Sequence, residues 1–420
     1  MQSNGQPRYM RVLRVLVLLG AATSIVVGAI YALSAPRGFK NGGEDMLWGS
    51  QDHHLRYNEA RLILHGENPY QLALEGRLKA RAMEVLGTDH LDPDYFPSTL
   101  LPVLLVCWLP FHVVQVLWFA ANLFSMFLIY RAVCWMLEGC LPSANARLLA
   151  VCLWIYSYPV WGCLVMGQAT LFSLAFTLTA FRMDIRGRPV VAGLLLALGV
   201  FKYPVVWPFV LFFFILQGRW RCLLTAGGLH LVVHLILCRI MQAHPVTIFA
   251  DVLAGNGKVF NRSSLLTFWT PFRHWNTWFP DLAVPAQWLG ALTLLAAVAW
   301  LARLWMRRPR DSREHLVVWT AVLAVLAVLT VYSRIYCHAY ELPVLMLAGV
   351  SATSTLALRV RLVVLVLLLC QGYNSHLAGM VPTVLVPWLH LLSNTLLFLL
   401  ALELGWLVFR LERASNQRTV

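Results

Sequence analysis

The recurrence of long apolar segments is the feature that most constrains how this chain can fold. Hydrophobic residues make up 59% of its 420 residues and charged residues only 12%, which is about half the charged share of a water-soluble domain. A helix of about 20 apolar residues is long enough to span a bilayer. The sequence therefore predicts an all-α polytopic membrane protein, with residues 1–420 forming a single integral membrane domain.

We expect a bundle of about twelve transmembrane helices. Several apolar segments are shorter than a straight span, so the boundaries near Trp161 and Lys202 are the least defined. The stretch 99–111 carries two prolines and is expected to re-enter the membrane or to form a broken first part of the second span. The segments lie at 12–34, 112–130, 148–160, 164–181, 189–203, 204–217, 222–241, 284–302, 316–332, 341–357, 362–377 and 389–409.

Membrane topology explains the net charge of +14. With the N-terminus in the cytoplasm, 20 of the 33 Lys and Arg residues but only six of the 19 acidic residues fall on the cytoplasmic side, as the positive-inside rule requires. The excess charge thus suits anionic membrane lipid, and nucleic acid is not an expected partner. We predict that both termini are cytoplasmic. High Arg, Leu and Trp usage favours the plasma (inner) membrane of a bacterium.

Polar sequence is concentrated in loops on the outer side. The first extracytoplasmic loop covers 35–98 and the second large one covers 242–283, and ten of the 19 acidic residues lie between Glu44 and Asp94. In the first loop we expect a helix over Asp52–His65, ended by a glycine and an Asn-Pro pair. We also expect an amphipathic helix over Gln71–Leu86, which either lies on the outer leaflet or packs on the bundle. The outer face is therefore the expected working face.

Cationic and polar side chains recur at the predicted outer ends of the spans. Lys202 interrupts an apolar run beside a proline, where it either snorkels to the interface or holds an anion. The later loops add groups that suit a phosphate or a sugar. These are Asn261, Arg262, Arg334, His338 and Glu341.

The nine cysteines predict neither a disulfide framework nor a metal site. They form no CxxC pair and most lie in apolar segments, where cysteine behaves as a small apolar residue. The adjacent His53 and His54 lack further ligands at a metal-binding spacing. We expect no bound metal.

Six stretches, in order over residues 40–345, resemble glycosyltransferase family 87 of the GT-C superfamily. The first, "DHHLRYNEARLILHGENPY", is similar to the family's D-x-x-x-Y-x-x-A-x-x-L-x-x-G-x-N/D-P-Y signature. The others are "DPDYFPSTLLPVLLVCWLPF", "GQATLFSLAFTLTA", "FKYPVVWPFVLFFF", "NRSSLLTFW" and "SRIYCHAYELPVL". Ser98, Thr170 and Arg262 depart from the residues usual in these motifs.

The resemblance implies a GT-C-type bundle and an inverting transfer from a polyprenyl-phosphate sugar, with mannose the favoured sugar. The acceptor would be a glycolipid or a lipid-linked glycan, and the family's enzymes generally need no metal and no cofactor. The resemblance also implies an acidic base in the first outer loop. The spacing favours Asp52, with Asp45 and Glu44 as second choices. Asp52 is also a credible helix N-cap, or the partner of Arg56, four residues on.

The chemistry agrees with the available side chains. A phosphate leaving group needs charge neutralisation, for which the candidates are Lys202, Arg262, Arg334 and His338, with Asn261 beside them. An acceptor hydroxyl needs a general base. The expected supporting residues are Arg56, Tyr57, Gln168, Tyr95 and Glu341.

A polytopic lipid or solute transporter, or flippase, is the alternative interpretation. Such proteins carry internal repeats and charges in the middle of their spans. In this sequence we detect no repeat, and Arg239 and Glu403 are the exceptions to nearly uncharged spans. The sequence therefore favours the enzyme.

Overall fold

The computed structural model describes residues 8–34, 37–41, 44–48, 50–93, 95–136, 158–259 and 295–306. It also describes single residues and pairs at 147–148, 151–152, 154–155, 292, 316, 319–320, 322–323 and 326. The predicted spans at 341–357, 362–377 and 389–409 lie outside this part of the chain.

Nearly all the elements in the described part of the chain are helices, as expected for an apolar chain of this kind. The N-terminal half contains α1 (Arg8–Ala32), α2 (Gln51–Leu64), α3 (Pro69–Leu74), α4 (Leu78–Leu86), η1 (Pro97–Leu100), α5 (Leu101–Leu104) and α6 (Phe111–Met136). Then follow α8 (Tyr158–Met166), α9 (Thr170–Ile185), α10 (Pro189–Gly199), η2 (Val200–Lys202), α11 (Tyr203–Phe209), η3 (Val210–Ile215), α12 (Trp220–Ile240) and α13 (Pro245–Val259).

One short antiparallel sheet, which we did not expect, interrupts the helical fold. Strand β1 (Arg37–Asn41) pairs with β2 (Glu44–Trp48), with Asn41 opposite Glu44. The missed sequence signal is Gly42-Gly43, because a Gly-Gly pair is typical of a two-residue hairpin turn.

The described residues include three stretches that are long and apolar enough to cross a membrane. These are Phe111–Met136, Pro189–Ile215 and Trp220–Ile240. A fourth forms if α8 and α9, which meet at a bend of 110°, are taken together as one broken span. The protein is thus a membrane protein, while the count of twelve spans and the GT-C-type bundle stay predictions.

The stretch Pro189–Ile215 has the length of one span, but its contacts show that it turns back at Lys202. Along α10 the chain runs antiparallel to α9, so that the backbone N–H of Lys202 reaches the Ser173 hydroxyl at 2.9 Å. After the turn the chain returns along α9: Phe213 stacks on Phe181, and Arg219 forms a salt bridge with Asp184. This agrees with the expected division into segments 189–203 and 204–217.

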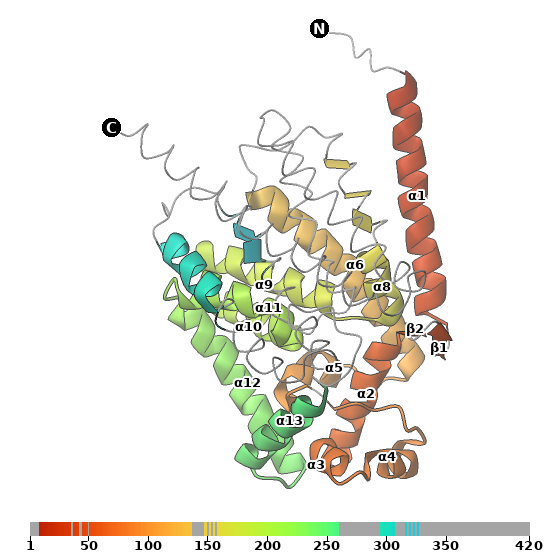
Figure 1. Cartoon of the computed structure of the whole chain (residues 1–420), viewed down its shortest axis with the longest axis vertical. Coiled ribbons are helices and arrows are strands. Elements are labelled where there is room, and N and C mark those ends of the chain that lie inside the picture. Colours follow the sequence, from red (N-terminus) through yellow and green to blue (C-terminus); the bar gives the residue numbers. More distant parts are fainter. Residues whose placement is uncertain are drawn as a thin grey trace, which may run out of the picture.

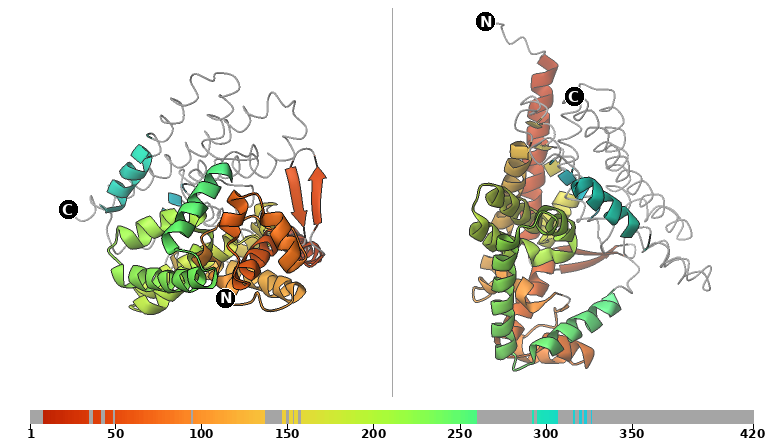
Figure 2. Two further views of the ribbon diagram at one scale, coloured as in Figure 1. Left: turned by 90° about the horizontal axis from the view of Figure 1, so that it is seen from below. Right: turned by 90° about the vertical axis from the view of Figure 1, so that its left-hand side faces the viewer.

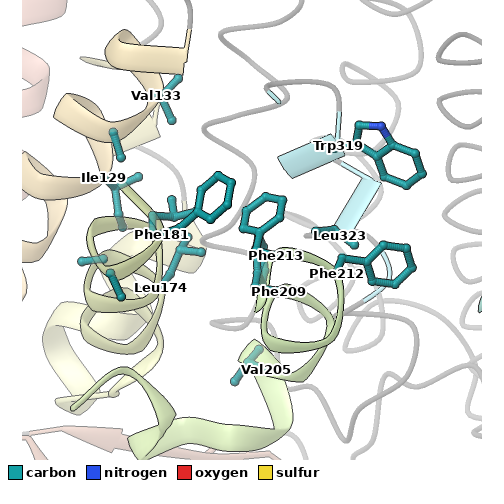
Figure 3. Packing of buried hydrophobic residues seen from close by; sticks show 14 of the residues in the cluster. Ile129, Val133, Leu174, Phe181, Val205, Phe209, Phe212, Phe213, Trp319 and Leu323 are labelled. Atoms are coloured by element: carbon teal, nitrogen blue, oxygen red, sulfur yellow. The ribbon is translucent and has the colours of Figure 1, made fainter. Parts of the chain in front are cut away.

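The main hydrophobic core includes the interface between α9 and the returning segment of α11 and η3. Figure 3 shows Phe181 of α9 facing Phe213, with Phe209 one turn away on the neighbouring helix. Three consecutive phenylalanines, Phe212 to Phe214, are fully buried in η3. This π-helical turn begins two residues after Pro208, a proline inside α11. Because proline removes a helical hydrogen bond, it commonly accompanies such irregular turns.

Residues 50–93 fold back on the longer helices as a compact subassembly. Figures 1 and 2 show α2, α3, α4 and α13 at the end of the molecule opposite the N-terminus of α1. The predicted helix over Asp52–His65 is confirmed as α2. The predicted single helix over Gln71–Leu86 is wrong: Gly76, at φ +73°, separates α3 from α4, because a left-handed residue ends a helix.

The apolar stripe of α4 packs against protein. Leu78 and Ala82 are buried in one small cluster with Leu62 of α2 and Leu72 of α3. The stripe therefore packs on the neighbouring helices α2 and α3, in agreement with a helix packed on protein.

Candidate functional site

The start of α2 is anchored on the corner where α8 meets α9. Ser50 donates its backbone N–H to the Val165 carbonyl at 3.0 Å and its hydroxyl to the Ala32 carbonyl at the end of α1, also at 3.0 Å. Gly167 forms the corner at φ +66°. A Cβ atom at Gly167 would lie 2.9 Å from the Ser50 Cβ. Only glycine allows this close approach, so the corner sets the position of the α2 N-terminus.

A histidine and a tryptophan fill the space beneath this anchor. The buried His53 ring stacks on Trp118 of α6 with ring centroids 4.1 Å apart, and the Trp118 indole N–H donates to the Gly167 carbonyl at 2.8 Å. Burial, with smaller contributions from His54 and Arg56, lowers the pKa of His53 to about 3. His53 is therefore neutral near pH 7 and acts as a packed aromatic group.

Two of the three faces of α2 contact neighbouring segments of the chain. On one face, the Tyr57 hydroxyl donates to the Leu109 carbonyl at 2.8 Å, which ties α2 to the start of α6. On another, Asn58 donates to the His90 carbonyl at 3.0 Å and lies 3.2 Å from the His54 ring. Burial, together with the neighbouring His90, lowers the pKa of His54 to about 4. Tyr57, expected to support the site, thus makes a contact that holds α2 in place.

The third face of α2 carries Asp52, Arg56 and Glu59. These residues follow i, i+4 and i+7 spacing, which places them in one stripe. Ser50 is the N-cap and Asp52 lies in the first turn, so the N-cap interpretation of Asp52 is wrong. A carboxylate in the first turn is favoured by the helix dipole. The Arg56 guanidinium forms a 2.6 Å salt bridge with Glu59.

Lys202 points inward. Its ammonium donates to the Gln168 side-chain oxygen at 2.5 Å and to the Thr170 hydroxyl at 2.9 Å, and the residue is only 8% exposed. The snorkelling interpretation is therefore wrong. Gln168 and Thr170 accept these hydrogen bonds and orient the ammonium.

The Tyr95 ring contacts both the third face of α2 and the turn at Lys202. The Arg56 guanidinium carbon lies 4.6 Å from the centroid of the Tyr95 ring. The same ring contacts Phe201 at 5.9 Å and Tyr203 at 6.3 Å, the two neighbours of Lys202. The structure therefore brings five predicted site residues into one region: Asp52, Arg56, Tyr95, Gln168 and Lys202.

The contacts above do not involve the second-choice bases or the predicted residues of the later loops. Glu44 and Asp45 lie on β2, opposite Asn41 and Lys40. The residues Asn261, Arg262, Arg334, His338 and Glu341 lie outside the described part of the chain. Sequence reasoning missed Glu59 and Thr170, and the available signal for Glu59 was its i, i+3 spacing from Arg56.

Groups suited to a metal are not found in this part of the chain. No set of three or more His, Cys, Asp or Glu side chains among the described residues is arranged to hold a metal ion.

The family model described as glycosyltransferase family 87 matches residues 95–331, which is more than half of the chain. The matched range includes Tyr95, Gln168 and Lys202, while Asp52 and Arg56 precede it. No curated protein and no solved structure matches the chain.

Proposed function

The chain belongs to glycosyltransferase family 87, and from this premise we propose that it transfers a sugar, preferably mannose, from a polyprenyl-phosphate donor. The acceptor is a glycolipid or a lipid-linked glycan, and the transfer inverts the anomeric configuration. One observation carries the proposal. The buried Lys202 ammonium is held in place by hydrogen bonds, and the Tyr95 ring links the Lys202 turn to the face of α2 that carries Asp52.

Lys202 would stabilise the leaving phosphate. As the bond between the sugar C1 and the phosphate oxygen breaks, its electron pair and negative charge pass to the phosphate. A fixed cation in a site sheltered from water is an effective stabiliser of such developing charge. Gln168 and Thr170 hold the ammonium in place, so little reorganisation is needed during the reaction. Asn261, Arg262, Arg334 and His338 are proposed as further donor-binding residues.

Asp52 would act as the general base. It would take the proton of the acceptor hydroxyl as the acceptor oxygen bonds to C1 on the face opposite the phosphate. One such displacement inverts the configuration and needs no covalent intermediate. Asp52 is preferred over Asp45 and Glu44 because α2 is anchored at Ser50 on the Gly167 corner.

The proposed site lies at the outer face of the plasma membrane, with both termini in the cytoplasm. Support comes from the position of α2 to α4 opposite the N-terminus of α1 (Figure 1). Neither a metal nor a cofactor takes part in the proposed reaction, since the donor supplies an activated sugar and the side chains supply the base and the cation.

The proposal is tested by comparing Asp52→Asn with Asp89→Asn in purified protein. Asp89 is an exposed acid of the 87–93 loop, so Asp89→Asn makes the same chemical change away from the site. We expect Asp52→Asn to lower the transfer rate by about 10²- to 10⁴-fold, and Asp89→Asn to leave it unchanged. Full activity of Asp52→Asn would exclude this base. Failure of the unaltered protein to transfer from any polyprenyl-phosphate sugar would exclude the donor class.

A further inference from the structure

Four buried side chains with polar groups lie on one face of α6, a helix long and apolar enough to span the membrane. They are Gln115, Trp118, Asn122 and Ser125, each no more than 5% exposed, and their spacing of three and four residues places them in one stripe. Polar side chains inside a span are costly to bury and commonly bond across helices. The scheme above gives Asn122 no role, although this residue is only 1% exposed.

The stripe contacts the corner between α8 and α9. The two helices meet at 110°, and a break of this kind in a span leaves backbone groups that neighbouring helices must satisfy. The Trp118 indole N–H donates to the Gly167 carbonyl at 2.8 Å. In the amide orientation that its neighbours require, Asn122 donates to the Gln168 backbone carbonyl at 3.2 Å and accepts from the same indole at 3.3 Å. Two consecutive carbonyls of the corner are therefore held by α6.

Gln168 connects this corner to the proposed site. Its backbone N–H donates to the Cys163 carbonyl at 2.9 Å, its backbone carbonyl accepts from Asn122, and its side-chain oxygen accepts from the Lys202 ammonium at 2.5 Å. Both peptide units that flank the Gln168 Cα atom are thus held, which fixes the backbone angles φ and ψ. Since these angles determine the allowed side-chain rotamers, loss of the Asn122 contact would release one of the two restraints on the side chain that holds the ammonium.

We propose that Asn122 is a positioning residue, which fixes the Gln168 backbone so that the Gln168 side chain directs the Lys202 ammonium at the leaving phosphate. This inference rests on the proposed transfer reaction. Asn122 acts on the reaction through Gln168 and the cation, without a contact of its own to the reactants. It extends the machinery of the site from α2 and the Lys202 turn to the buried face of α6.

The test compares Asn122→Leu with Ser125→Ala in purified protein. Leucine has a branched shape similar to that of asparagine but can neither donate nor accept a hydrogen bond. The Ser125 hydroxyl donates to the Ala121 carbonyl of its own helix at 2.7 Å, so Ser125→Ala breaks a hydrogen bond within α6 rather than one to the corner. We expect Asn122→Leu to lower kcat by about 10-fold with little change in KM for the donor, because the additional phosphate charge appears only in the transition state. Ser125→Ala should keep its kcat.

Thermal melting in detergent checks that both variants fold. If Asn122→Leu does not fold, Asn122→Ser takes its place, because a serine hydroxyl can bond to the preceding turn of its own helix while its reach is shorter than that of the asparagine amide. For Asn122→Ser we expect a loss of about 3- to 10-fold in kcat.

A double-mutant cycle with Lys202→Met separates positioning from a general loss of packing. We expect Asn122→Leu to cause no further loss of kcat in the Lys202→Met background, because the ammonium that it positions is already absent. Equal losses in both backgrounds would overturn the proposal, as would equal kcat values for Asn122→Leu and Ser125→Ala, and either result would leave the transferase function standing. A lack of transfer by the unaltered protein from all polyprenyl-phosphate sugars would overturn both.

Discussion

The contact between Gly167 and the start of α2 is the most direct test of how the site is assembled. Replacing Gly167 with alanine places a Cβ atom 2.9 Å from the Ser50 Cβ and 3.0 Å from the His53 Cβ. Ordinary van der Waals contact begins near 3.4 Å, so the N-terminus of α2 must retreat by roughly half an ångström. Asp52 lies in that first turn and must move with it.

The expected cost of Gly167→Ala has two parts. A non-glycine residue in the left-handed region costs about 1–2 kcal/mol, and forcing atoms into a packed contact costs about 1–3 kcal/mol. The total is about 2–5 kcal/mol. Gly87→Ala is a matched control, because Gly87 has a similar φ of +72° but no atom of the described residues within 4 Å of the added Cβ. Gly87→Ala should therefore lose only about 1–2 kcal/mol, the cost of the left-handed conformation.

Thermal unfolding in detergent and the transfer rate measure the two consequences. We expect Gly167→Ala to melt at a lower temperature than Gly87→Ala and to lose about 10- to 100-fold in kcat, because misplacement of a reacting group by about 1 Å can cost about 10²-fold. Gly87→Ala should keep its kcat. Equal melting temperatures and equal kcat values for the two variants would refute the packing of α2 on the Gly167 corner.

Three further predictions concern the cation, the helix packing and the pH dependence. Lys202→Met, which removes the charge but keeps the chain length, should lower kcat by about 10²-fold or more, and an unchanged kcat would contradict its role at the phosphate. Gly193→Ala would place a Cβ 2.4 Å from a side chain of α12 and should cost about 1–3 kcal/mol in unfolding measurements. Gly228→Ala, with no described atom within 4 Å, is its control, and similar stabilities would argue against the α10–α12 contact. The pKa of His53 is lowered from 6.5 to about 3 by burial, so the unfolded chain binds a proton that the native protein does not. Stability should therefore fall below pH 6.5 by up to about 1.4 kcal/mol per pH unit, and a His53→Phe variant whose melting temperature keeps the same pH dependence would contradict this.

Several local features were predictable because their causes lie close together in the sequence. The helix expected over Asp52–His65 is observed as α2 over Gln51–Leu64. The break at Lys202, beside Pro204, is also observed. In both cases the determinant is a nearby proline or glycine that restricts the backbone. The break at Gly76 was equally local, but the continuous apolar stripe on either side of it concealed the signal.

Two features of the candidate site needed packing information. Spacing singled out Asp52 and Arg56, and the structure adds a salt bridge between Arg56 and Glu59 that the Tyr70 hydroxyl supports. Spacing also left Lys202 able to point either way. Its inward direction depends on Gln168 and Thr170, more than 30 residues earlier in the chain.

The sequence by itself determined the class of the protein, the apolar segments, the family and most of the residue types of the site. These depend on composition, on periodicity and on short motifs, each of which is a property of neighbouring residues. Only the tertiary structure decided which side chains meet: Ser50 reaches the Gly167 corner from more than 100 residues away, and Tyr95 lies between Arg56 and the Lys202 turn. Contacts of this kind follow from the close packing of whole helices. An added Cβ at Gly167, for example, would lie 2.9 Å from Ser50 at the start of the helix that carries Asp52.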